Sequence, residues 1–209
     1  MKMDRMEQLV KKIKSEHERL VYVSGRTCTG KSTLSRAIRD GLDFAAIDLD
    51  QVVYSLPKVD GKNRFEEVYL KRDDMGMINE FVDRTKAAID ESLKSHAGVI
   101  FEGAIATNET LKQVIGDHKD FLFVYLLPVN LDKYLERILK RFSLELHGLP
   151  DRLWEIVSRD QHREYLDNQK MTPELKASLT RFAEVSMHGA KTRLEMFQKE
   201  FDDIYVIEI

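Results

Sequence analysis

The chain has 209 residues, enough for one domain with a sizeable core, and its 43% hydrophobic and 33% charged residues are typical of a globular protein. Its 33 basic and 36 acidic residues leave a formal net charge of -3, so charge gives no reason to expect nucleic acid or a membrane surface as a partner. Cys28 is the only cysteine, which rules out an intramolecular disulfide and fits a reducing compartment. The first twenty residues lack a signal-peptide pattern, and the longest apolar run, residues 121–127, is too short to cross a membrane. We therefore expect a cytoplasmic protein.

Hydrophobic patterns along the chain predict strands that alternate with helices. In chain order we expect a helix at 4–17, a strand at 20–23, a helix at 31–40 ending at Gly41, a strand at 44–47, a polar loop around 57–63, a helix at 78–93, strands at 99–101 and 121–127, a helix at 131–142, more helical sequence from about 153, and a last strand at 204–207.

This alternation predicts an α/β fold, with about five parallel strands in one sheet and helices on both of its faces. Residues 121–127 are continuously apolar, as expected of a strand buried on both faces, and we expect this strand to be central. Ligands of such sheets bind outside the C-terminal ends of the strands. Because no repeat, low-complexity tract or linker divides the chain, residues 1–209 are predicted to form one domain.

The strongest signal for function is the segment GRTCTGKST. Gly25, Gly30, Lys31 and Ser32 match the pattern G-x-x-x-x-G-K-[ST] between a predicted strand and a predicted helix. The glycines let the backbone curl with its N–H groups inward, and the helix N-terminus adds positive potential for phosphate groups. Lys31 would contact the terminal phosphates of ATP, and the Ser32 hydroxyl would bind Mg²⁺. The residues expected to bind the nucleotide are Gly25, Arg26, Thr27, Cys28, Thr29, Gly30, Lys31, Ser32 and Thr33.

Acidic residues lie at the ends of two further predicted strands. Asp48 and Asp50 are two residues apart, so they would project to the same side as long as the second strand continues. Glu102 ends the third strand, and Gly103 permits a sharp exit from it. Carboxylates at this edge could orient an acceptor hydroxyl, take its proton, or bind Mg²⁺. Acidic residues are also common turn formers and solvated strand ends, and this alternative stays open for each of them.

These segments together resemble the small P-loop kinases, which have the three-layer fold of the P-loop NTPases. VIFEGAIAT resembles a strand and loop of uridine kinases and nicotinamide riboside kinases, and IDLDQVVY resembles the strand-end acidic motif of those kinases and of shikimate kinase. The resemblance implies ATP and Mg²⁺, a nucleoside-type acceptor, and Asp50 as the base that orients the acceptor. The comparison with shikimate kinase gives Asp48 a role as well, and Glu102 is implied at the magnesium or acceptor site.

The segment LDKYLERILKR resembles the arginine-bearing helix that leads into a mobile lid in these kinases, so we expect a lid at about 142–165. Arg137 and Arg141 lie four residues apart on one predicted helix face and would stabilise charge on the transferring phosphoryl group. Arginines that follow them could do the same, namely Arg152, Arg159 and Arg163. For all five, a solvated or ion-paired side chain is the alternative.

Aromatic residues could stack on a planar acceptor, with core packing as the alternative; they are Tyr54, Phe65 and Tyr69. The six histidines show no metal-binding spacing, and we assign none of them to catalysis.

The sequence therefore predicts transfer of the γ-phosphoryl group of ATP to a hydroxyl of a small molecule. The expected acceptor is a nucleoside or nucleoside-like metabolite. The expected catalytic residues are Lys31, Asp48, Asp50, Glu102, Arg137 and Arg141, and the expected magnesium ligands are Ser32, Asp48 and Glu102. Kinases of a sugar, an antibiotic or a nucleoside monophosphate remain open alternatives. So does a nucleotide-dependent switch, although no guanine-reading N-K-x-D motif is apparent.

Overall fold

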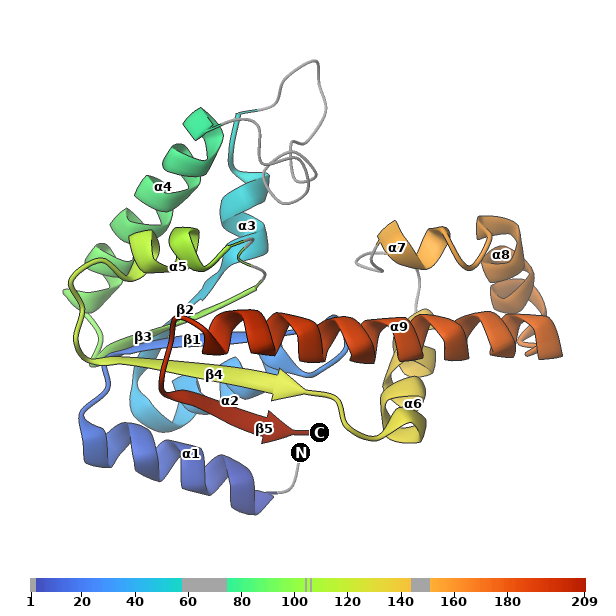
Figure 1. Ribbon diagram of the computed structural model, residues 1–209, viewed down its shortest axis with the longest axis horizontal. Helices are drawn as coiled ribbons and strands as arrows, with labels where there is room; N and C mark the ends of the chain where they lie inside the picture. Colours follow the sequence, from blue (N-terminus) through green and yellow to red (C-terminus); the bar gives the residue numbers. More distant parts are fainter. Residues whose placement is uncertain (1–2, 58–74, 104, 106, 144–150) are drawn as a thin grey trace. The chain divides into compact units, whose positions relative to one another are not determined.

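The computed structural model describes residues 3–57, 75–103, 105, 107–143 and 151–209 (Figure 1). In chain order its elements are α1 (Met3–Glu16), β1 (Leu20–Gly25), α2 (Lys31–Leu42), β2 (Phe44–Asp48), α3 (Leu49–Tyr54), α4 (Met75–Leu93), β3 (Gly98–Glu102), α5 (Asn108–Ile115), β4 (Phe121–Leu127), α6 (Leu131–Phe142), α7 (Asp151–Trp154), α8 (Arg159–Asn168), α9 (Pro173–Gln198) and β5 (Ile204–Glu208). Within the described ranges, no helix has both the length and the apolar character needed to cross a membrane.

The five strands form one sheet in the order β2-β3-β1-β4-β5. β3 pairs in parallel with both β1 and β2, and the register sets Asp48 opposite Glu102. At the ends of β4 and β5, Ile209 N–H donates to Leu127 O and Val129 N–H donates to Ile209 O, the slanted pattern of a parallel pair. The arrows of β4 and β5 point the same way in Figure 1. The predicted α/β fold with a five-stranded parallel sheet is confirmed.

The expectation that β4 is the central strand was wrong, because β1 holds the middle position and β4 lies between β1 and the edge strand β5. A continuous apolar run indicates burial on both faces, which every internal strand of a covered sheet has. Such a run therefore distinguishes an internal strand from an edge strand. It does not predict which of the internal positions in the sheet order the strand takes.

The chain divides into two compact units. The first comprises the described residues of 1–24, 31–125 and 196–205, and the second comprises those of 25–30, 126–195 and 206–209. The expectation of a single domain with a lid at 142–165 stays a prediction.

Aromatic rings form the centre of the first unit. Tyr22 lies with its ring centroid 4.9 Å from those of Phe101 and Phe123, and Phe123 meets Phe197 edge-on, also at 4.9 Å. Helices α1 and α2 cover one face of its strands, and α4 and α5 cover the other (Figure 1). This packing on both faces holds the C-terminal ends of β1 and β3 in place, and the acidic residues lie at that edge.

The second unit has an apolar core of its own, contributed by α6, α7 and α9 and by Val157. On α8, His162 is 2% exposed, and its Nε2 lies 2.8 Å from the carbonyl oxygen of Phe142, the last residue of α6. The Arg159 guanidinium lies over the Trp154 ring, 5.7 Å from its centroid. These contacts hold α8 against the end of α6 and against α7.

Three differences from the predicted elements have local causes. α2 continues through Gly41 to Leu42, and the left-handed residue that follows is Asp43, with φ 53°. A polar loop was expected after β2, but α3 begins directly at Leu49 with Asp48 as its N-cap. α5 was also not predicted, and it too has a side-chain cap, because the Thr110 N–H donates to the Thr107 side chain.

Candidate active site

The phosphate-loop sequence, Gly25 to Gly30, forms a tight turn in the second unit. Gly25 has φ 147°, and a Cβ there would lie 2.9 Å from both the Leu126 carbonyl oxygen and Thr29 Oγ1. The Thr29 hydroxyl donates to the Arg26 carbonyl oxygen at 2.7 Å, and Thr29 is 2% exposed. Cys28 also has a left-handed backbone, with φ 65°, which is uncommon for a residue other than glycine. The backbone therefore curls as the motif predicts.

Side chains of α6 bind the carbonyl groups of this loop. The Tyr134 hydroxyl donates to the Thr27 carbonyl oxygen at 2.8 Å, and Arg137 Nη1 donates to that of Thr29 at 3.0 Å. Tyr134 is 2% exposed, whereas Arg137 is half-buried. Sequence reasoning selected Arg137 but missed Tyr134, because an apolar position on an amphipathic helix gives no sign that its hydroxyl meets a loop 107 residues away.

Arg141, four residues further along α6, has an exposed side chain, as does Arg163 on α8. Arg159 contacts the Trp154 ring, as described above. Cys28 packs against the apolar core of the second unit, which anchors the tip of the loop.

The first unit brings together the second half of the motif and the acidic residues. The Ser32 hydroxyl, in the first turn of α2, donates to Glu102 Oε2 at 3.1 Å. Burial raises the pKa of the Glu102 carboxyl above its ordinary value, and the charges of Asp48 and Asp50 raise it further. The hydrogen bond from Ser32 and the positive charge of Lys31 oppose this rise. Lys31, Ser32, Asp48 and Asp50 therefore all lie within electrostatic reach of the Glu102 carboxyl, as expected where parallel strands end together.

The reason given for the Asp48–Asp50 pair was wrong, because the strand does not continue past Asp48. The Asp48 side chain caps α3 and accepts a hydrogen bond from the Asp50 backbone N–H at 2.9 Å, so Asp50 lies in the first helical turn. Asp48 is exposed and Asp50 is half-buried. A Cβ at Gly103 would lie 3.6 Å from Asp50 Oδ1, which places the Asp50 carboxyl at the exit of β3.

Gly103 and Tyr22 shape that exit. Gly103 has φ 138°, and a Cβ there would lie 2.8 Å from Leu49 Cβ, so only glycine lets α3 pack this closely. The buried Tyr22 hydroxyl donates to the Gly103 carbonyl oxygen at 3.0 Å and accepts from the Ile105 N–H at 3.3 Å. Sequence reasoning missed Tyr22 because it lies within an apolar strand.

Tyr54 is 53% exposed at the end of α3, and Thr33 is exposed in the first turn of α2. Phe65 and Tyr69, the other two aromatic residues expected to stack on the acceptor, lie outside the described residues. The side chain of Arg152 lies outside the described part as well.

The donor set fits magnesium better than a metal that needs several side chains. Among the described residues, no cluster of three or more His, Cys, Asp or Glu side chains could hold a metal ion. Mg²⁺ is usually bound by one or two carboxylates together with phosphate oxygens and water. The hydrogen-bonded pair of Ser32 and Glu102, with Asp48 paired opposite in the sheet, matches that requirement.

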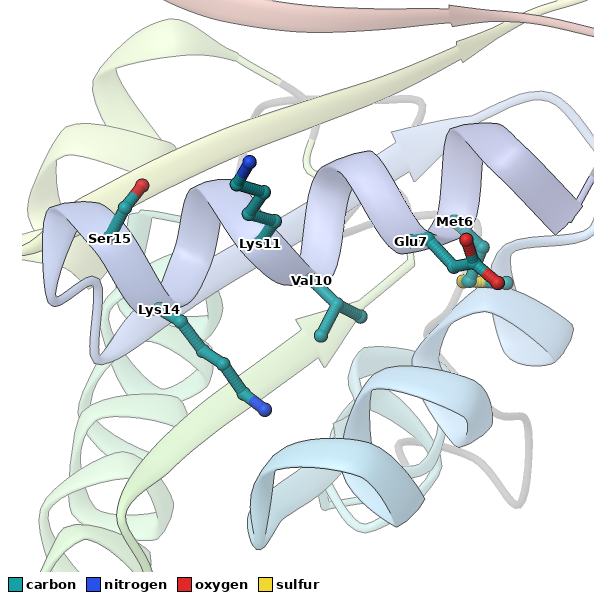
Figure 2. A pocket seen from close by; sticks show the side chains of 6 residues that line it. All are labelled: Met6, Glu7, Val10, Lys11, Lys14 and Ser15. Carbon is teal, nitrogen blue, oxygen red and sulfur yellow. The ribbon is translucent and has the colours of Figure 1, made fainter.

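A separate hollow of about 470 Å³ lies along α1 (Figure 2). Its lining residues are Met6, Glu7, Val10, Lys11, Lys14 and Ser15. None of them belongs to the motif GRTCTGKST or is one of the strand-end acidic residues Asp48, Asp50 and Glu102. We therefore do not assign the proposed chemistry to this hollow.

No protein-family model matches the chain, and no curated protein matches it in sequence. Several solved structures resemble the chain at low identity, among them two kinases and a transferase that acts on tRNA. A sugar kinase from Janibacter sp. HTCC2649 is 15% identical with a TM-score of 0.42, over 85% of this chain and 95% of that one. Shikimate kinase from Aquifex aeolicus is 17% identical with a TM-score of 0.37, over 83% and 98%. A tRNA isopentenylpyrophosphate transferase from Bacillus halodurans is 14% identical with a TM-score of 0.47, over 91% and 90%. Function therefore has to be inferred from the chain's own residues.

Proposed function

We propose that the protein transfers the γ-phosphoryl group of ATP to a hydroxyl group of a small molecule. The observation that carries this proposal is the hydrogen bond of 3.1 Å between Ser32 and Glu102. It joins the last residue of the phosphate-loop pattern to a carboxylate at the end of a neighbouring strand, which is the arrangement that a magnesium-bound nucleotide requires.

Each charged group then has a separate role. Lys31 interacts with the terminal phosphates, and the backbone N–H groups of residues 25–30 bind their oxygens. Ser32, Asp48 and Glu102 would hold Mg²⁺, which neutralises phosphate charge when bound. Arg137 and Arg141 keep the role that the sequence predicts for them, which is to supply positive charge for the transferring group.

Asp50 acts as the base in this proposal. The acceptor oxygen attacks the γ-phosphorus in line, the bond from that phosphorus to the bridging oxygen of ADP breaks, and the hydroxyl proton passes to the Asp50 carboxylate. The half-buried position of Asp50 at the exit of β3 supports this choice over the exposed Asp48, which caps a helix. A nucleoside-like acceptor is the more specific proposal and rests on the resemblance of VIFEGAIAT and IDLDQVVY.

The test is transfer of labelled γ-phosphate from ATP across a panel of nucleosides, sugars, antibiotics and nucleoside monophosphates. We expect a labelled product with one class, and its loss in Lys31→Ala. The matched control is Lys94→Ala, which removes a lysine that is 70% exposed and pairs with Glu91 at the end of α4. Equal transfer by the wild type and Lys31→Ala would remove the phosphate-loop assignment.

A further inference from the structure

A glycine in the interior of α9 lies against the phosphate loop. α9 has 26 residues and continues through Gly189, although glycine has a low helix propensity. A Cβ built at Gly189 would lie 3.0 Å from Cζ and 3.4 Å from Nε of Arg26, and closer still to Nη2. The Nε atom of Arg26 is buried. The guanidinium group therefore occupies the space in which any other residue would place its side chain.

Arg26 belongs to a loop that needs external support. Cys28, two residues after Arg26, has a positive φ of 65°. A residue other than glycine keeps this conformation only when its surroundings enforce it. A loop whose N–H groups face phosphate must direct its carbonyl groups elsewhere, and two of these, on Thr27 and Thr29, are bound by α6. Contact with α9 at Arg26 is a third support on the same short segment, and all these groups belong to the second unit.

We propose that Gly189 is a positioning residue: because it lacks a Cβ, it leaves a recess in α9 that holds the Arg26 side chain and so fixes the phosphate loop in its nucleotide-binding conformation. The proposal rests on the proposed function of that loop. Preorganisation of this kind favours binding because the loop does not have to be ordered when the nucleotide arrives.

The recess itself can be tested without any activity. We would compare the melting temperatures of the wild type, Gly189→Ala, Arg26→Ala and the double variant. Gly189→Ala should lower the melting temperature of the wild type, because the new methyl group displaces Arg26. In the Arg26→Ala background the same change should raise it by about 2–4 °C, because alanine is the better helix former and the recess is then empty. An equal effect in both backgrounds would show that Arg26 does not fill the recess.

Gly41→Ala is the matched control. Gly41 also lies within a helix, α2, and a Cβ there would meet nothing within 4 Å. We expect this variant to keep or raise the melting temperature in both backgrounds. If Gly189→Ala is too unstable to purify, recovery of folded protein in the double variant, measured by circular dichroism, answers the same question.

The positioning role is tested by the dissociation constant for ATP, measured well below the melting temperature of every variant. Gly189→Ala should weaken ATP binding about tenfold, because a displaced Arg26 no longer holds the loop in its nucleotide-binding conformation before the nucleotide arrives. In the Arg26→Ala background, Gly189→Ala should change the dissociation constant for ATP by less than about twofold, because its effect acts through Arg26. Unchanged ATP affinity in Gly189→Ala would overturn the positioning role. If the wild type itself does not bind ATP, the proposed function fails, while the melting temperatures still decide whether the recess holds Arg26.

Discussion

Replacing Tyr134 with phenylalanine tests how α6 supports the phosphate loop. The substitution keeps a buried ring in the apolar core of the second unit and removes only the hydroxyl that donates to the Thr27 carbonyl oxygen at 2.8 Å. That carbonyl group then loses a hydrogen bond in a part-buried setting, which costs about 1–3 kcal/mol of unfolding free energy. For a chain of this size the melting temperature should fall by roughly 2–12 °C.

The loop should also bind ATP more weakly, since the same hydrogen bond fixes the loop before the nucleotide arrives. The assays are thermal unfolding and ATP titration, with Tyr165→Phe as the control. Tyr165 packs on the same apolar core but, within the described ranges, has no hydrogen bond to the loop. If Tyr134→Phe matches the wild type in both assays, α6 does not support the loop in the way we describe.

Three further predictions concern the acidic residues and one glycine. Asp50→Asn should lower kcat by about 10²–10⁴-fold with ATP affinity unchanged, as expected for loss of a general base, and a comparable loss only in Asp48→Asn would move the base to Asp48. Burial and the repulsion of nearby acidic groups raise the pKa of Glu18 in the folded state, so stability decreases as pH rises above the unfolded value of about 4.3. Glu18→Gln should therefore have a higher unfolding free energy than the wild type in urea at pH 7 and an equal one near pH 3.5, and equality at both pH values would contradict this. Gly25→Ala should lose about 1–3 kcal/mol of stability, because its φ is 147° and its Cβ would lie 2.9 Å from two oxygen atoms; equal melting temperatures for this variant and the wild type would contradict the strain.

The sheet, and the motif at its edge, could be predicted from the sequence because their signals are local. The strand at 121–127 and the helix at 131–142 have the predicted bounds, and α2 begins at Lys31 within the motif itself. Parallel order then explains why Asp48 and Glu102 lie side by side at one edge.

What the sequence did not reveal depends on contacts between distant segments or on a choice between two local structures. Asp48 could continue a strand or cap a helix, and both patterns begin with the same residues, so α3 was missed. The hydroxyl of Tyr134 and the missing Cβ of Gly189 matter only because of what they meet in the loop. Neither has a signature in its neighbouring sequence.

The most direct measurement follows the γ-phosphorus of ATP by phosphorus NMR in the presence of Mg²⁺ and the acceptor found by the labelled panel. The account predicts a new phosphomonoester signal that grows in step with ADP and is absent in Lys31→Ala. Inorganic phosphate as the sole new product, at a rate unaffected by the acceptor, would contradict a phosphoryl transfer and indicate a nucleotide hydrolase.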